Sequence, residues 1–154
     1  MTAVAPPTAE PADIAAHAPE ARRALAALTR AAAALDYRTA ELVKTRVSQI
    51  NGCAYCVDLH ASALREDGED PRRIDALPVW RDSPFFSPAE RAALDLAEGL
   101  TRLHGGGHDP AAYAAARAHW SDAEVALIAL VAIGINAWNR YMLATGKEVP
   151  GLEP

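Results

Sequence analysis

The sequence predicts an all-α protein, a single-domain bundle of about six or seven helices. Long stretches rich in alanine and leucine carry apolar residues at helical spacing. The strand signal is weak, because β-branched residues seldom alternate with polar ones and no hairpin dipeptide separates two such runs. At 154 residues the chain fits one domain, and a chain of this length buries about 70% of the surface that its unfolded form exposes.

The chain divides into three parts. Residues 1–18 form an N-terminal arm expected to be flexible, because prolines interrupt it and it lacks the basic start and apolar core of a secretion signal. Residues 19–146 form the helical domain, and residues 147–154 form a C-terminal tail. With no export signal we expect a cytoplasmic protein, where two neighbouring cysteines are catalytic or redox-active more often than permanently bridged.

The helix boundaries follow from capping residues, taken in order along the chain. Aspartates that can cap a helix N-terminus stand at positions 36, 70 and 109, and the last two precede a proline. Ser87 and Ser121 each open a capping box with a glutamate three residues later. The predicted helices cover residues 20–35, 37–51, 53–67, 71–77, 88–103, 110–119 and 122–145.

The last predicted helix is apolar on nearly every side over residues 125–138. That run of about 14 residues is shorter than the roughly 20 that span a bilayer, so we expect a central or interface helix and no membrane span. Part of its surface is expected to meet another subunit. Asn136 and Asn139 interrupt the run, and because buried amides need partners they are expected to tie this helix to the active-site helices or to reach across a subunit boundary.

The charge distribution excludes one class of partner, and a connector between the helices carries three aromatic residues. The formal net charge is −5, and the 15 Lys and Arg residues are dispersed and form no basic stripe, so nucleic acid is not an expected partner. Lys44 and Arg46 are expected to be surface charges. Trp80, Phe85 and Phe86 lie in a connector and either cover the core, which is the default, or form a wall of a pocket.

The chemistry centres on two cysteines spaced Cys53-x-x-Cys56, with His60 four residues on. If Gly52 ends one helix and Cys53 opens the next, the three side chains share an arc of about 60°. A helix N-terminus favours a thiolate, and cysteines in such settings have a pKa lowered from about 8.5 to roughly 3.5–7.5. We therefore predict a reactive thiol, with His60 exchanging its proton and the second thiol able to close a disulfide.

Other roles for these residues are open at this point. Two cysteines can simply pack in a core. A structural zinc site needs four ligands, and Cys53, Cys56 and His60 supply three, with Glu41 or His17 as a conceivable fourth. Covalent haem attachment is excluded, because valine and not histidine follows the second cysteine. The histidines that flank three glycines at 104–108 are expected to lie in a flexible surface loop and not at a metal.

The stretch resembles the alkylhydroperoxidase-like (AhpD-like) branch of the carboxymuconolactone decarboxylase family. That branch shares a Glu, eleven residues, Cys-x-x-Cys, three residues and a His, and Glu41, Cys53, Cys56 and His60 match it at every spacing. The resemblance implies an all-helical oligomer, a trimer or hexamer, that reduces hydroperoxides with a cysteine pair. It implies no cofactor and no bound metal.

The resemblance also implies a role for each matching residue. Cys56 would attack the peroxide, Cys53 would resolve it, His60 would be the base near Cys56, and Glu41 would end a proton relay. Tyr55 stands where the best studied members carry a second histidine. A tyrosine passes a proton only through a hydroxyl that titrates near 10, so the relay differs here and Tyr55 is a possible member of it.

The sequence thus predicts a peroxidase-type oxidoreductase, a thiol-dependent hydroperoxidase or disulfide reductase. Its partners would be a hydroperoxide substrate, a lipoyl-bearing or thioredoxin-like reductant, and further copies of the chain. A decarboxylase acting on a lactone is an alternative, although the decarboxylases that name the family do not rely on a Cys-x-x-Cys pair. The second alternative is a non-catalytic oligomeric protein that binds a partner or holds a metal.

Overall fold

A computed structural model describes residues 10–103 and 109–151, and the expected glycine loop at 104–108 lies outside this part of the chain. Within the described residues all regular structure is helical, which confirms the all-α prediction. The elements are α1 (Ile14–His17), α2 (Pro19–Ala31), α3 (Tyr37–Asn51), α4 (Ala54–Glu66), α5 (Pro71–Ala76), the 3₁₀ turn η1 (Leu77–Val79), α6 (Pro88–Arg102), α7 (Pro110–Arg117) and α8 (Asp122–Ala144).

The predicted capping residues start the helices as expected. Asp36 accepts a hydrogen bond from a backbone N–H in the first turn of α3, and Ser87 and Ser121 open complete capping boxes at α6 and α8. Two larger differences from the prediction are found, while the other helix bounds agree within two residues. The helix α2 ends at residue 31 and not at 35, because the chain turns there and buries Leu35 in the core. The short helix α1 lies inside the predicted arm.

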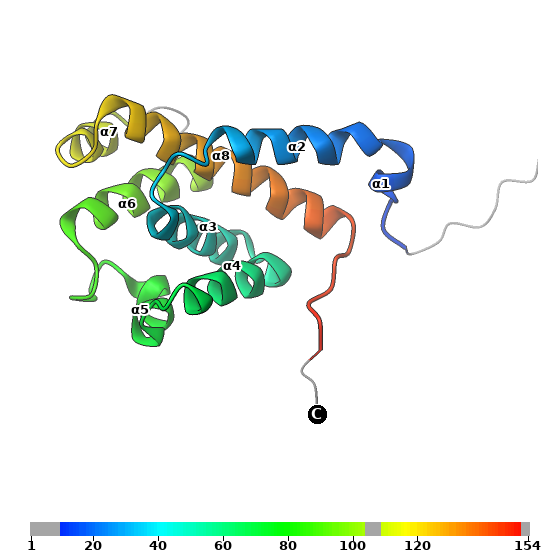
Figure 1. The fold of residues 1–154 in the computed structure, drawn as a ribbon, viewed down its shortest axis with the longest axis horizontal. Coiled ribbons are helices and arrows are strands. Elements are labelled where there is room, and N and C mark those ends of the chain that lie inside the picture. The colour runs from blue at the N-terminus through cyan, green and yellow to red at the C-terminus, as the bar shows by residue number, and fades with distance from the viewer. Residues whose placement is uncertain (1–9, 104–108, 152–154) are drawn as a thin grey trace, which may run out of the picture.

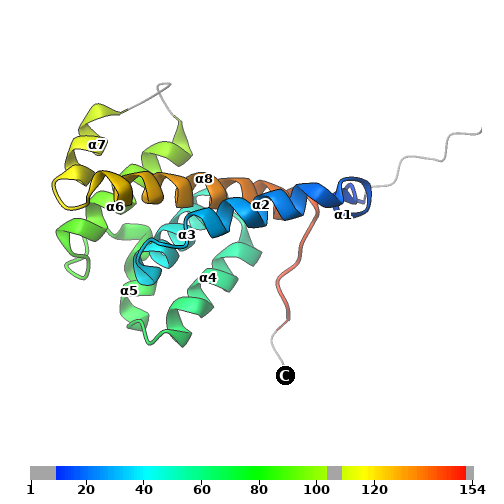
Figure 2. The ribbon, with the colours of Figure 1, turned by 45° about the horizontal axis from the view of Figure 1, so that its top comes forward.

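The bundle is organised around α8 and α3. The helix α8 packs against α2, α3, α6 and α7, and α3 packs against α4 and α6 as well. Figure 1 shows α2 running beside α8 on one side, with α3 and α4 on the other, and Figure 2 shows the same arrangement from a tilted view. The hairpin of α3 and α4 is thereby held against the C-terminal half of α8.

The length argument against a membrane span does not hold for the whole of α8. The helix has 23 residues, and over 18 of them it is apolar enough to cross a bilayer by length and composition. Its contacts place it in the bundle instead: residues such as Ile128, Ala132 and Ile135 are buried against neighbouring helices. Ile133 and Leu143 remain about half exposed, so part of the apolar surface is left uncovered in one copy of the chain.

Arg46 is not a surface charge as predicted. It is 8% exposed and its Nε lies 2.5 Å from an Oε1 of Glu98, itself 2% exposed. Trp80 donates its indole N–H to the same carboxylate at 3.0 Å, and Arg81 approaches the other oxygen at 2.6 Å. A carboxylate with three donors can be buried without an unpaired charge. The sequence pattern could not indicate the Arg46–Glu98 ion pair, because Glu98 is 52 residues away from Arg46 in the sequence.

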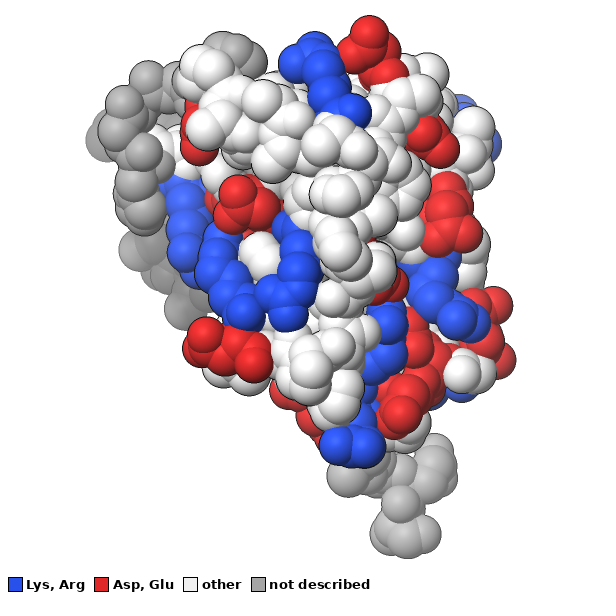
Figure 3. All heavy atoms as spheres, turned by 90° about the vertical axis from the view of Figure 1, so that its left-hand side faces the viewer, with Lys and Arg blue, Asp and Glu red and all other residues white. Residues whose placement is uncertain are grey.

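The connector after α5 covers the core, as the default expectation had it. Trp80 and Phe86 are each 4% exposed and belong to the main cluster of buried side chains. On the outer face of this region Lys and Arg side chains are interspersed with Asp and Glu (Figure 3). Ion pairs such as Arg81 with Asp95 account for part of that mixture. This face therefore has no block of one sign that would attract a polyanion.

Glu98 makes folding depend on pH. Burial alone would raise the pKa of Glu98, but hydrogen bonds from Arg81, Trp80 and Arg46 outweigh it and lower the pKa from 4.5 to about 2. A carboxyl with a lowered folded pKa stabilises the native state above its unfolded pKa and loses that contribution as pH falls through the folded pKa. This contribution is therefore present at neutral pH and disappears between about 4.5 and 2.

We expect Glu98→Gln to lower the free energy of unfolding at neutral pH by about 3 kcal/mol. The difference from wild type should shrink as pH falls below about 4.5. Urea unfolding followed by circular dichroism across pH measures both effects. Glu20→Gln, which removes an exposed pair with Arg23, should change stability by less than about 1 kcal/mol. A Glu98 effect that is independent of pH would contradict the assignment.

Candidate active site

The turn between α3 and α4 places both cysteines. Gly52 has φ of 69°, a left-handed conformation that suits glycine. Cys53 donates its backbone N–H to the Ser48 carbonyl at 3.1 Å, closing the end of α3. Its Sγ accepts the backbone N–H of Cys56 at 3.3 Å and so caps the N-terminus of α4. The chain thus needs a cysteine, or another acceptor, at this position to begin α4.

Cys53 and Cys56 are joined by a disulfide, with their Cα atoms 5.3 Å apart. Cys56 and His60 face one pocket, one helical turn apart on α4. Cys53 is the N-cap residue and precedes the first helical residue, so the helical arc of about 60° does not describe it, although its sulfur is bonded to that of Cys56. Of the two cysteines, Cys56 belongs to the lining of the pocket and Cys53 does not.

Glu41 of α3 and His60 of α4 are in direct contact. The Glu41 Oε2 lies 2.7 Å from His60 Nδ1, and Glu41 is 4% exposed. An ionised carboxylate can only accept hydrogen bonds, so Nδ1 is the donor and Nε2 is left free to take a proton. The structure thus brings together residues that are separate in the sequence. Glu41 contacts His60, and His60 lines the same pocket as Cys56.

Lys44 is part of this cluster and not a surface charge as predicted. Its Nζ lies 2.6 Å from the other oxygen of Glu41, and the lysine side chain is only 19% exposed. The spacing of three residues on one helix could have indicated the pair, since side chains at i and i+3 are neighbours. Nothing in that spacing predicted the burial.

Lys44 and His60 determine the charge of Glu41. Burial by itself would raise the pKa of this carboxyl. Hydrogen bonds and positive charge from His60 and Lys44 outweigh burial, and the pKa lies below its usual value of 4.5. Glu41 is therefore an anion at neutral pH, although it is almost inaccessible to water.

The pocket beside Cys56 has a volume of about 660 Å³ and is mostly apolar. Helices α2, α3, α4 and α8 all contribute to its wall. Tyr55 lies on this wall with Lys147 from the C-terminal tail over its ring, 5.5 Å from the centroid. Within the described residues the Tyr55 hydroxyl makes no hydrogen bond, so it is not linked to the Glu41–His60 pair in this structure.

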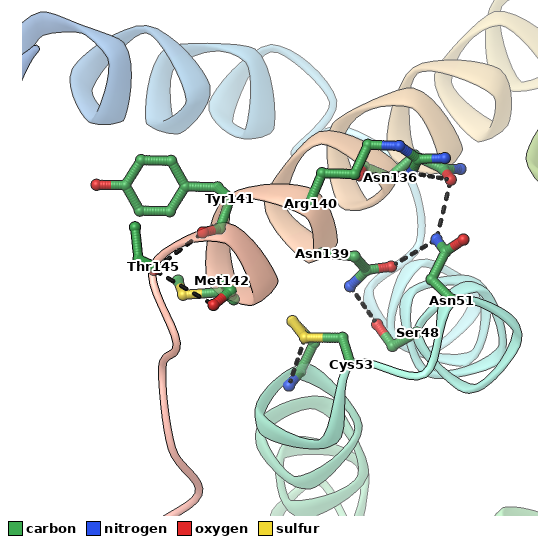
Figure 4. The surroundings of a disulfide bond; sticks show 10 residues. Ser48, Asn51, Cys53, Asn136, Asn139, Arg140, Tyr141, Met142 and Thr145 are labelled. Carbon is green, nitrogen blue, oxygen red and sulfur yellow. Dashed lines mark hydrogen bonds between the residues drawn. A yellow bond between two sulfur atoms is a disulfide. The ribbon is translucent and has the colours of Figure 1, made fainter. Parts of the chain in front are cut away.

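A buried polar network ties the cysteine turn to α8, as the amides of that helix led us to expect. Asn51 donates to the side-chain oxygens of Asn136 and Asn139, each at 2.9 Å. Asn139 in turn donates to the Ser48 hydroxyl at 2.9 Å. Figure 4 shows these side chains around the turn that carries Cys53. The sequence indicated two of the four residues, because only those on α8 interrupt an apolar run.

Among residues 10–103 and 109–151 no group of three histidine, cysteine, aspartate or glutamate side chains is arranged to hold a metal ion. In the disulfide both sulfurs are bonded to each other and unavailable as thiolate ligands. Between Glu41, His60, Cys56 and Cys53 the arrangement offers a redox pair, a proton acceptor and a buried anion. These are the parts of a thiol-based redox site.

The sequence pattern of the carboxymuconolactone decarboxylase family matches residues 12–99, which include the whole cysteine turn and Glu41. The chain belongs to this family. The uncharacterized protein YdfG of Bacillus subtilis (strain 168) is 39% identical over 114 residues, or 74% of this chain and 78% of that protein. The uncharacterized protein YnjA of Escherichia coli (strain K12) is 37% identical over 71 residues, or 46% of this chain and 39% of that protein.

Solved structures place the chain in the AhpD-like branch, as the motif predicted. A protein of unknown function from Agrobacterium tumefaciens, described as a candidate antioxidant defence protein AhpD, is 35% identical, with a TM-score of 0.87 over 93% of this chain and 99% of that chain. An uncharacterized peroxidase-related protein from Ralstonia eutropha JMP134 with an AhpD core is 26% identical, with a TM-score of 0.76 over 88% and 74% of the two chains.

The same fold carries other chemistry. The debrominase Bmp8 is 19% identical, with a TM-score of 0.76 over 88% of this chain and 74% of that chain. At that identity the likeness concerns the fold alone. The fold is therefore that of a family with several enzymatic members, and the reaction of this chain has to be argued from its own residues.

We expect Lys44→Met to raise the pKa of Glu41, because one of the two partners that oppose burial is removed. The carboxyl has a lowered folded pKa, so its contribution to stability is lost as pH falls through that pKa. In Lys44→Met the loss should begin at a higher pH. Carbon NMR of glutamate carboxyls reads the titration directly. Lys147→Met, which leaves both partners of Glu41 in place, should not move it, and an unchanged titration in Lys44→Met would contradict the cluster.

Proposed function

We propose that this protein is a thiol-dependent hydroperoxidase with disulfide reductase chemistry, in which Cys56 is the attacking residue. The observation that carries the proposal is that Cys56 and His60 line one pocket, where Cys56 forms a disulfide with Cys53 and His60 a hydrogen bond with Glu41. Membership of the AhpD-like branch is consistent with it. The reaction class is peroxidase-type oxidoreduction with no cofactor.

In the first step the Cys56 thiolate attacks the terminal oxygen of a hydroperoxide. The S–O bond forms, the O–O bond breaks, and the departing alkoxide takes a proton to leave as an alcohol. Sulfur is oxidised to a sulfenic acid and the peroxide is reduced. Cys56 suits this role better than Cys53, because Cys56 is among the residues that line the pocket while the Cys53 sulfur caps α4.

In the second step the Cys53 thiolate attacks the sulfenic sulfur of Cys56. The disulfide forms and the hydroxyl leaves as water after taking a proton. A dithiol then reopens the disulfide by exchange and is itself oxidised. We propose a lipoyl-bearing or thioredoxin-like protein as that reductant, on the basis of the family resemblance.

His60 and Glu41 would manage the protons of these steps. The free Nε2 of His60 can take the thiol proton and return it to the leaving oxygen. Glu41 holds His60 by its other nitrogen and stabilises the imidazolium that forms. Tyr55 is proposed as a possible further member of the relay, since it lies on the same wall.

Substituting each cysteine in turn distinguishes the attack on the peroxide from the formation of the disulfide. Cys56→Ser should lose fast oxidation of the reduced protein by hydrogen peroxide and tert-butyl hydroperoxide. Cys53→Ser should keep the first step and accumulate a sulfenic acid, which dimedone traps and mass spectrometry detects. Slow, unselective oxidation of the wild type, or stoichiometric zinc in the purified protein, would overturn the proposal. The zinc result would favour the metal-holding alternative.

Glu41→Gln should slow peroxide-driven thiol oxidation about 10²-fold or more, because general acid–base help is worth that much and the glutamine cannot balance an imidazolium. Stopped-flow rates across pH measure it, with circular dichroism to confirm folding. Glu20→Gln, on an exposed pair, is the matched control and should leave the rate unchanged. Equal rates in wild type and Glu41→Gln would remove Glu41 from the mechanism.

Two alternative functions make different predictions. A decarboxylase acting on a lactone would release carbon dioxide and would not need the cysteines, so the double cysteine variant would stay active. A non-catalytic binding protein would show neither activity. The geometry favours the peroxidase, because it places the pocket at the cysteine pair.

We also propose that the protein is a cytoplasmic homo-oligomer, a trimer or hexamer. The support is uncovered apolar surface: α2 has no buried residue, and Ile133 and Leu143 of α8 are each 52% exposed. Light scattering at micromolar concentration tests it, and a monomer at that concentration would contradict it.

A further inference from the structure

We propose that the pocket beside Cys56 takes a hydroperoxide with a long apolar body and a carboxylate that pairs with arginines of α2. This inference rests on the proposed function and names its substrate class. A carboxylate-bearing chain is distinguished from hydrogen peroxide by size and from a neutral hydroperoxide by charge.

The size of the pocket points to a large ligand. Its volume of about 660 Å³ lies in the range of sites for drug-sized molecules. A water molecule occupies about 30 Å³ in the liquid, so hydrogen peroxide would leave the space nearly empty. The side chains around this space belong mainly to alanines, leucines, valine, isoleucine, tryptophan and methionine, which gain from covering an apolar chain.

The pocket is long as well as wide, because two neighbouring helices line it. From α8 it is lined between Leu130 and Met142, a rise of about 18 Å at 1.5 Å per residue. From α2 it is lined between Arg22 and Ala33. The Trp138 indole donates to the Thr29 hydroxyl at 2.8 Å and holds the two helices together. An extended chain fits such a groove better than a compact molecule does.

The α4 part and the α2 part of the wall differ chemically. Cys56 and His60 come from α4 and form the reactive part. Arg22 and Arg30 come from α2, about 12 Å apart along its axis, and both line the pocket. Both arginines are exposed, and within the described residues neither makes an ion pair or hydrogen bond. Arg23, which does not line this pocket, is paired with Glu20 at 2.8 Å.

The charge balance favours an anion. The residues that line the pocket include Arg22, Arg30, Lys44 and His60 but no aspartate or glutamate. Lys44 is already neutralised by the buried Glu41. The two arginines therefore leave uncompensated positive charge beside an apolar surface. A guanidinium pairs readily with a carboxylate, so the ligand would place its carboxylate at α2 and its peroxide at Cys56.

The binding part of the proposal can be tested without any reaction. Decanoate and decylammonium have the same chain and opposite charge, and calorimetry on the full chain measures their affinities. Decanoate should bind more tightly. Arg22→Gln with Arg30→Gln should weaken decanoate about fivefold. The control is Arg23→Gln with Arg65→Gln, which removes the same charge outside this pocket and should keep the affinity within about twofold.

The kinetic part uses linoleic acid hydroperoxide, its methyl ester and tert-butyl hydroperoxide, with loss of free thiol in the reduced protein as the readout. The acid should oxidise the wild type faster than the ester. The Arg22 and Arg30 double variant should abolish that preference and leave the rate with tert-butyl hydroperoxide unchanged, which a general loss of structure would not do.

The outcomes separate this inference from the proposed function. If no hydroperoxide oxidises the wild type quickly, the proposed function fails, and decanoate binding still decides the ligand assignment. Equal affinity for decanoate and decylammonium, equal rates for acid and ester, or an unchanged decanoate affinity in the double variant would each overturn the inference.

Discussion

The hydrogen bond between Glu41 and His60 is the interaction on which the site depends. This bond joins α3 to α4 inside the hairpin, with 2.7 Å between Glu41 Oε2 and His60 Nδ1. Lys44, paired with the other oxygen, helps to keep the Glu41 carboxyl ionised. A buried carboxylate is unfavourable unless it is paired and hydrogen-bonded. Lys44 of α3 and His60 of α4 are the two partners, so the Glu41 carboxylate can be buried in the hairpin. Its hydrogen bond in turn fixes the orientation of the His60 imidazole, which lines the pocket of Cys56.

A second constraint acts from the opposite side. The amides of Asn136 and Asn139 connect α8 with Ser48 and Asn51 around the cysteine turn. The disulfide therefore lies beside both the Glu41–His60 pair of the α3–α4 hairpin and the polar network that reaches α8. A half-satisfied network would cost more than an apolar core, so this arrangement commits α3, α4 and α8 to one geometry.

Much of the fold could be predicted because its signals are local. Caps at Asp36, Ser87 and Ser121 act within one turn of their own helix, and the structure has helices where they stand. The end of α2 was misplaced, since no local breaker stops it and burial of Leu35 decides. Lys44 and Arg46 were assigned to the surface, because a charged side chain gives no sign of a buried partner contributed by packing.

The sequence by itself determined the helical class, the capping sites, the family, and the four residues spaced as Glu41, Cys53, Cys56 and His60. It could do so because those spacings are read along one chain and on one or two helices. Only the tertiary structure decided that Glu41 meets His60, that Cys56 and not Cys53 lines a pocket, and that α2 brings two unpaired arginines to the wall of that pocket. Those facts depend on how helices pack against each other, and packing joins residues whose separation in sequence carries no periodic signal.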